Sequence, residues 1–453
     1  MDDDARSRIA EITTRYVVDV TDDDYDPYVH RNVEHATSYL ETLVHILKAS
    51  LGTGVLAMPI AFKYAGLVNG VIGAILTAFV CGVGIHRFFA SQYTICKNLK
   101  VSYMPYSVIM KVALLSGPRC MSKVANFFGT LSDALLLLHQ TGVCAVYVIF
   151  ISNNLKDLLK RPYTNLNVPV EYYMLCLLPA LLLIVSVPNM KKMARITLLS
   201  NCATLVSVII IIAVLSPNLP DISLRHKTGT VFDSALAFGI MLFALSAMGV
   251  ILTVEKHMKE PKQMVAYFGT LNVSLVAILI VYTLIGFIGY WQVGDEVKDI
   301  IILDLQNYNE TARQCAQSLY VVAIFVSYGL SAMVFVDVLW GNYLKHYLAE
   351  SRHHDKGQCA TRILVVFVST FAAAAIPLFA DIVALLGSFS MSSLELIFPA
   401  IMDICVRWPD KFGRGKWTLI ADLILMAIGV GGLLIGGFSA IRSIVRHLNE
   451  LRG

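Results

Sequence analysis

The sequence contains eleven apolar stretches that are long enough to cross a lipid bilayer. They lie at about 40–66, 68–94, 124–152, 170–187, 193–216, 232–254, 264–291, 314–343, 361–379, 382–405 and 417–441. A membrane-spanning helix needs about 20 apolar residues and satisfies its own backbone groups. Of the 453 residues 57% are hydrophobic and only 15% are charged, which is too few charges for a soluble protein. We therefore predict an all-α integral membrane protein with about 11 transmembrane helices.

Composition and motifs argue against several other classes of protein. The net charge is +4, which gives no strongly basic surface for a nucleic acid. The nine cysteines form no CxxC pair and show no metal-ligand spacing with histidine, so we expect no bound metal. No HExxH or GxSxG motif is present, so we expect no enzymatic activity. Residues 1–37 are polar and acidic, which predicts a disordered tail and no cleavable signal peptide.

Lysines and arginines are concentrated in alternate loops. The loops of one parity hold 20 of them, and the opposite loops hold seven. Because positive residues are retained on the cytoplasmic side, the amino terminus is predicted to be cytoplasmic. The sequon Asn309-Glu310-Thr311 then lies in an outer loop, so we predict N-glycosylation of Asn309.

The first apolar stretch contains Gly52, Thr53 and Gly54 near its middle, with Pro59 about a turn later. Glycine is poor in a helix interior and proline removes a backbone hydrogen bond, so the stretch is predicted to unwind here. Free backbone groups at membrane depth are tolerated only where they line a cavity or bind a ligand. N–H groups near Gly54, with Ser50 beside them, would bind an anion such as a carboxylate. Close packing of small residues against another helix is the alternative.

The sixth apolar stretch also has small residues in mid-membrane. Gly54 and Gly249 are 195 residues apart, which is the separation expected of two five-helix repeats. Interrupted helices at corresponding positions of two repeats indicate the binding site of a transporter. Carbonyl groups near Phe243, Ala244 and Ser246 would then bind an ammonium group.

Five segments spread over the chain have more specific sequences. They are His45–Gly66, Leu319–Leu330, Arg362–Pro377, Leu386–Ala400 and Gly429–Ile441. These segments resemble helices of the proton-coupled amino acid transporters, within the amino acid/auxin permease family, over roughly residues 40–445. The resemblance implies a LeuT-like 5+5 inverted repeat plus one extra helix, with helices 1 and 6 broken. It also implies proton-driven amino acid symport, with the proton as coupling ion and no cofactor.

This layout gives a transporter domain over residues 38–445, preceded by the tail. Repeat one would span about 40–216, repeat two about 232–405, and the extra helix about 417–441. The sequence departs from the family at Leu245-Ser246-Ala247, where Phe-Glu-Gly is usual. Residues 153–170 contain no cysteine, so the outer disulfide that the family implies is not expected here.

Titratable side chains inside the membrane are costly and are therefore candidates for function. His45 matches the family's histidine linked to proton coupling, and imidazole titrates near physiological pH. Glu395 would offset the acid lost at Ser246, either as a proton carrier or as a partner for the ammonium group. A structural pair with another helix is at least as strong an interpretation of Glu395. Lys48 would either snorkel or pair.

Other polar side chains in the spans have simpler interpretations. Asp133, His139 and Gln140 lie close together on one predicted helix, and a polar contact between helices is favoured over a proton relay. Tyr328 would either line the pore or form a hydrogen bond between helices.

The leading interpretation is proton-coupled symport of small neutral amino acids by alternating access, in the plasma membrane or the lysosomal membrane. A sodium-coupled or uniport carrier is one alternative. Another is a receptor that senses amino acids and signals through its tail with little flux. Deletion of residues 1–37 would separate a carrier, which should keep its uptake, from a receptor, which should lose its output.

Overall fold

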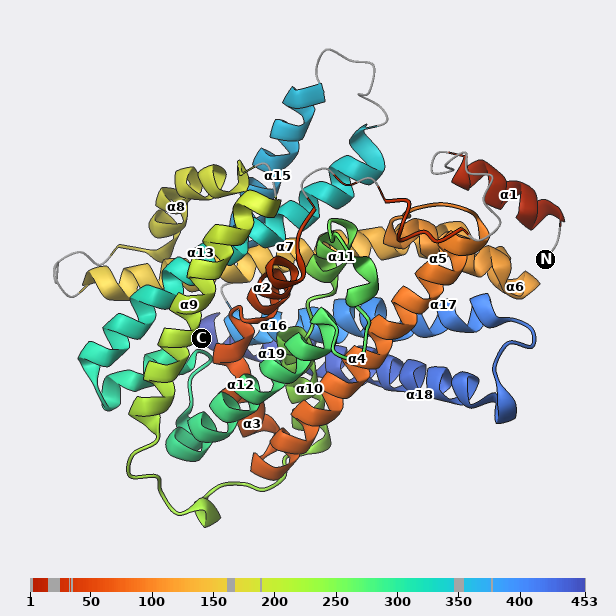
Figure 1. The fold of residues 1–453 in the computed structure, drawn as a ribbon. Helices are drawn as coiled ribbons and strands as arrows, with labels where there is room; N and C mark the ends of the chain where they lie inside the picture. Colours follow the sequence, from red (N-terminus) through yellow and green to blue (C-terminus); the bar gives the residue numbers. More distant parts are fainter. Residues whose placement is uncertain are drawn as a thin grey trace.

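The computed structural model describes residues 3–14, 25–31, 33, 36–160, 168–187, 190–345, 354–375 and 378–452. Within these ranges the ordered elements are helices, and no β-strand occurs beyond a single bridge between Thr37 and Met258. Figure 1 shows the helices packed into one bundle, with the long helix α4 (Leu67–Asn98) running diagonally across the view. The predicted all-α class is confirmed.

Nine helical segments of the described chain are long and apolar enough to cross a membrane. They are α4; α7 (Ala125–Lys160); α9 (Met190–Leu215); α10 (Val231–Leu245) with α11 (Met248–Lys256); α12 (Thr270–Val293); α13 (Glu310–Leu339) with η5 (Trp340–Leu344); α15 (His354–Ala375); α16 (Phe379–Leu385) with η6 (Leu386–Ile397) and α17 (Phe398–Arg407); and α18 (Trp417–Gly431) with η8 (Gly432–Gly436) and α19 (Gly437–Arg452). A tenth span is the broken pair α2 (Tyr39–Ser50) and α3 (Gly54–Ala65), bent by 48°. The 16-residue apolar helix α8 (Val170–Val185) corresponds to the remaining predicted stretch, at 170–187.

The broken pair lies at the centre of the bundle. Helix α3 packs against α10 and α12, and α2 packs against α9. Figure 1 shows α8, α9 and α13 on one side of this pair, and α4, α17 and α18 on the other. Nearly every residue of α3 is buried, as expected of a helix that is apolar all round.

Two short helices lie in segments that the sequence predicts to be loops. Helix α5 (Tyr106–Ser116) is apolar but has only 11 residues, which is too short to span a bilayer. It packs against α7 and α17. The second is η4 (Ile301–Asn307), in the connection between α12 and α13. Neither has the length by which the spans are recognised.

The described part of the tail, for which the sequence predicts disorder, contacts the helices of the bundle. Helix α1 (Asp3–Thr13) packs against α5, and Asp26 forms an ion pair of 2.6 Å with Lys262. The ring of Tyr28 lies 5.0 Å from that of Tyr93 in α4. An acidic composition does not reveal such contacts, because each partner is distant in sequence. Residues 1, 2, 15–24, 32, 34 and 35 of the tail lie outside the described residues.

The most deeply buried of these ion pairs is made by Arg31. Its guanidinium is buried and forms an ion pair of 2.8 Å with Glu255, near the end of α11. Its Nε donates a hydrogen bond of 3.1 Å to the carbonyl oxygen of Ser102. Further along, Thr37 pairs with His257 through a backbone hydrogen bond of 2.8 Å. We call the described part of residues 25–38 the N-terminal strap, because it ties the start of α2 to the end of α11.

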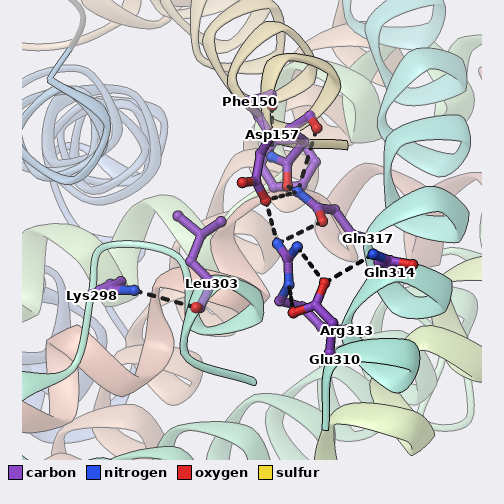
Figure 2. A network of polar contacts seen from close by, with 9 residues as sticks. Phe150, Asp157, Lys298, Leu303, Glu310, Arg313, Gln314 and Gln317 are labelled. Atoms are coloured by element: carbon purple, nitrogen blue, oxygen red, sulfur yellow. Dashed lines mark hydrogen bonds and ion pairs between the residues drawn. The ribbon is translucent and has the colours of Figure 1, made fainter. Parts of the chain in front are cut away.

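A second ion-pair network, around the buried Arg313, joins the end of α7 to the start of α13. Figure 2 shows the guanidinium of Arg313 between Asp157 and Glu310, with a contact of 2.9 Å to Glu310. Gln317 accepts a hydrogen bond of 3.0 Å from Arg313 and donates one of 2.9 Å to Asn154. The network therefore holds the end of α7 to the start of α13. These are the two regions that the outer disulfide implied by the resemblance would join.

Replacement of Arg313 with alanine is predicted to destabilise the fold by about 1–3 kcal/mol, because a buried guanidinium loses its hydrogen bonds to Asp157 and Glu310, whose side chains are 37% and 33% exposed. Thermal unfolding of the detergent-purified protein measures this change. Lys298→Ala is the control, since its exposed ammonium makes a single hydrogen bond within the described part of the chain, to the carbonyl oxygen of Leu303. Equal midpoints for the two variants would contradict the prediction.

Asp304→Asn is predicted to stabilise the protein at pH 7.5 more than at pH 5. Burial of Asp304 in η4 raises the pKa of its carboxyl to about 6, although the Lys298 N–H donates to it. An acid whose pKa is raised stabilises the fold when protonated, and this contribution is lost as the pH rises through about 6. Unfolding midpoints of both proteins at the two pH values test this. A gain independent of pH would refute it.

Candidate functional site

The break between α2 and α3 leaves residues 51–53 outside helical structure. Two tyrosine hydroxyls bind the carbonyl groups released there. Tyr282 of α12 donates to the carbonyl oxygen of Ser50, and Tyr320 of α13 donates to that of Gly52 at 2.8 Å. The first N–H groups of α3 have no acceptor within their helix. The break therefore offers N–H donors at the start of α3.

The second break lies between α10 and α11, at Ser246 and Ala247, whose backbone is not helical. It lies against the first break, since a Cβ atom at Gly54 would be 2.7 Å from the Cα of Ala244. Only glycine allows α3 and α10 to approach this closely. The prediction that helices 1 and 6 are both broken is thus confirmed.

A pocket lies between the two breaks. Its wall includes all seven residues that the sequence predicts to bind substrate, namely Ser50, Gly52, Thr53, Gly54, Phe243, Ala244 and Ser246. It offers about 30 Å³ to the centres of water molecules. A buried water needs about 10–15 Å³ on this measure, so there is room for two or three waters. Substrate binding by these residues stays a prediction.

Four polar side chains complete the pocket wall, and the sequence did not assign them to it. His139, Gln140 and Tyr147 come from α7, and Ser331 comes from α13. For His139 and Gln140 a contact between helices is predicted, but α7 turns both toward the two breaks. Polar residues in mid-span are the only signal that marks them. The wall contains no Asp, Glu, Lys or Arg among the described residues.

Two titratable residues of α2 lie away from the pocket. His45 is fully buried, nine residues before Gly54, and is not part of the pocket wall. Lys48 is also fully buried, and its Nζ donates a hydrogen bond of 3.1 Å to the Thr204 hydroxyl of α9. Burial excludes snorkelling for Lys48. Proton coupling through His45 stays a prediction.

Glu395 lies behind the pocket wall, fully buried in η6. Ser246 and Cys81 are within reach of its carboxylate, but neither oxygen has a hydrogen bond of good geometry among the described residues. The Ser246 hydroxyl instead donates to the sulfur of Met391 at 2.8 Å. Glu395 is therefore next to the second break without lining the pocket.

The remaining polar candidates form contacts between helices. Asp133 accepts hydrogen bonds from Tyr343 at 2.8 Å and from Asn342 at 3.3 Å, as the favoured interpretation predicts. The hydroxyls of Tyr328 and Ser369 are 2.8 Å apart and join α13 to α15. Tyr328 thus makes a hydrogen bond between helices and does not line the pocket.

Two predictions concern modification and metals. The side chain of Asn309 is exposed, and its Oδ1 caps α13 by accepting a hydrogen bond of 3.0 Å from the N–H of Ala312. Glycosylation of Asn309 stays a prediction. In the part of the chain that the structure describes, no group of three or more His, Cys, Asp or Glu side chains is arranged to hold a metal ion.

The sequence matches a known protein family and is similar to curated relatives. Residues 35–442 match the family described as "Transmembrane amino acid transporter protein". "Proton-coupled amino acid transporter-like protein pathetic" of Drosophila melanogaster is 30% identical over 431 residues, which cover 93% of this chain and 88% of that protein. "Probable amino acid transporter skat-1" of Caenorhabditis elegans is 24% identical over 424 residues, which cover 89% of each chain.

The fold is similar to that of two solved transporters. Mhp1, a nucleobase-cation-symport-1 family transporter in a closed conformation, superposes with a TM-score of 0.57 at 12% identity, covering 94% of this chain and 96% of its own. MhsT in complex with L-phenylalanine superposes with a TM-score of 0.55 at 12% identity, covering 90% and 100%. Both are transporters of the LeuT-like fold, so the predicted fold class is confirmed.

Gly54→Ala is predicted to lower the stability of the protein by about 1–3 kcal/mol, because its Cβ would force α3 away from the backbone of α10. The thermal midpoint of the purified protein measures the loss. Gly437→Ala is the matched control, since a Cβ at Gly437 meets no atom within 4 Å. A midpoint for Gly54→Ala as high as that of the control would show that the two breaks do not depend on this contact.

Proposed function

The chain belongs to the transmembrane amino acid transporter family, and on this premise we propose that it carries small neutral amino acids across a membrane by proton-coupled symport. It is a transporter and not an enzyme. The observation that carries the proposal is the single pocket in which the two broken helices meet.

The two breaks offer opposite partners to the two ends of an amino acid. N–H groups at the start of α3 and the positive end of its dipole attract the α-carboxylate. On the other side of the pocket, carbonyl groups near Phe243, Ala244 and Ser246 attract the α-ammonium. Backbone groups would thus bind both the α-carboxylate and the α-ammonium. Because every amino acid has these two groups, they do not distinguish one amino acid from another.

The rest of the pocket wall favours a small and uncharged side chain. No charged residue lines it, so a charged substrate side chain would be desolvated without a partner. Room for two or three waters corresponds to about 60–90 Å³ of liquid, the bulk of a very small amino acid. The hydroxyls of Tyr147 and Ser331 and the polar groups of His139 and Gln140 would bind a short polar side chain.

We assign proton coupling to His45, with Glu395 as a second candidate. His45 is buried in the half-helix that ends at the first break, so its protonation is linked to the position of α2. Glu395 lies behind Ser246 at the second break. Rocking of one repeat against the other would expose the pocket to each side in turn. No cofactor other than the proton is required.

We place the amino terminus and the N-terminal strap on the cytoplasmic side. The excess of Lys and Arg in the loops of that parity supports this orientation. A glycan on Asn309 would then lie on the outer or luminal side. The carrier would reside in the plasma membrane or the lysosomal membrane.

Sodium coupling and uniport are the alternatives to proton coupling. A receptor is the alternative to a carrier. A sodium-coupled carrier would use oxygen atoms such as that of Ser331, which lines the pocket. A uniport carrier would use no coupling ion. A receptor with little flux would still bind amino acid in the same pocket but would signal through its tail.

Uptake of labelled alanine, glycine and proline into proteoliposomes is predicted to rise with an inward proton gradient. His45→Ala should abolish the gradient-driven component, because the buried titratable group in α2 is lost. His226→Ala is the control: its side chain is 74% exposed in the connection between α9 and α10, away from the pocket. This control should keep the wild-type response.

Each other result of the uptake experiment would support one of the alternative functions. Uptake that depends on sodium and not on pH would overturn proton coupling, and uptake without either gradient would indicate a uniporter. Binding of amino acid without uptake would support the receptor. Gradient-driven uptake that survives in His45→Ala would move the coupling role to Glu395, which Glu395→Gln tests.

A further inference from the structure

A second cavity lies beside the pocket, at the end of α11 to which the N-terminal strap is tied. Gly249 lines both of them. The second cavity is bounded by α7, α11 and α13, together with the segment that leads into α5. It offers about 50 Å³ to the centres of water molecules, room for three to five waters. That corresponds to about 90–150 Å³ of liquid, enough for a small amino acid.

Two side chains of opposite charge face this cavity without neutralising each other. Lys256 of α11 and Asp337 of α13 both line it, and both are half-buried. Among the described residues, no ion pair of 4.0 Å or less joins either of them to another charged group. The Lys256 ammonium lies 5.8 Å from the ring centre of Tyr103, which is a cation–π contact.

The other acid in the cavity already has its partners. Asp133 accepts hydrogen bonds from the Tyr343 hydroxyl and the Asn342 amide. The cavity therefore offers one ammonium and one carboxylate to a ligand. Half-buried charges that do not meet each other are each free to form a charge-assisted hydrogen bond with a ligand group of opposite charge.

We propose that this cavity is a second binding site for a free amino acid, separate from the pocket between the breaks. Lys256 binds the α-carboxylate and Asp337 binds the α-ammonium of the zwitterion. The inference rests on the proposed function, because it takes the same ligand. It differs in chemistry: the first site uses backbone groups of broken helices, and the second uses two side-chain charges.

The position of the cavity gives the second site a role in release. A third cavity, of about 390 Å³, shares Asp133 and Asn342 with the second and is also lined by Arg8 and Glu11 of α1. The three cavities thus form a series from the first pocket to the end of the bundle that carries the amino terminus. A substrate leaving in that direction would pass through the second site.

The test is equilibrium binding of labelled alanine to the purified full-length protein in lipid nanodiscs. The wild type is expected to bind two molecules per chain at saturation. Lys256→Gln and Asp337→Asn are each expected to bind one, and the retained molecule shows that the fold and first site persist. Lys259→Gln and Asp410→Asn are matched controls with exposed side chains, and both should bind two.

The charges give the second site a further signature. Raising the salt concentration from 0.05 M to 0.5 M should lower the affinity of the second site more than that of the first, because salt screens the side-chain charges of the half-buried second site. The second site is identified as the one whose bound alanine is lost in Lys256→Gln. One molecule per chain in the wild type, unchanged in both charge variants, would overturn the second site while the proposed function stands. Complete loss of binding in either folded variant would also overturn it. No alanine binding by the wild type would overturn the proposed function as well.

Discussion

Backbone groups released at the centre of the bundle must find partners inside the protein, and the rest of the structure depends on this constraint. At membrane depth no solvent satisfies them. Tyr282 and Tyr320 bind two of the released carbonyls from neighbouring helices. The N–H groups at the start of α3 keep no such partner, so these tyrosines favour a first break that presents donors.

The chain restrains this loosened centre by ion pairs at both ends. Arg31 and Glu255 tie the start of α2 to the end of α11, which are the half-helices on one side of the two breaks. Arg313 holds α13 to α7 at the opposite end. Buried pairs of this kind define one arrangement strongly, because breaking them leaves an uncompensated charge. A carrier that alternates between two arrangements would have to break one set of such contacts at a time.

Local patterns in the sequence explain the part of this architecture that could be predicted. The lengths of the apolar stretches and the Gly-Thr-Gly sequence followed by Pro59 identify the spans and the first break, because both are properties of neighbouring residues. The strap could not be predicted, since Arg31 and Glu255 are 224 positions apart and the tail resembles a disordered segment in composition. His139 shows the same limit: its polarity is visible, but the face of α7 that meets the breaks depends on tertiary packing.

The N-terminal strap also affects the design of a truncated protein that lacks the tail. Removing residues 1–37 to ask whether the tail carries a signal would remove Arg31 as well and leave Glu255 buried without its cation. Such a chain would differ from the native one in conformational equilibrium, not only in its signalling segment. The informative truncation ends at residue 24, which keeps the described contacts of the strap with α4 and α11 and removes α1 with its contact to α5.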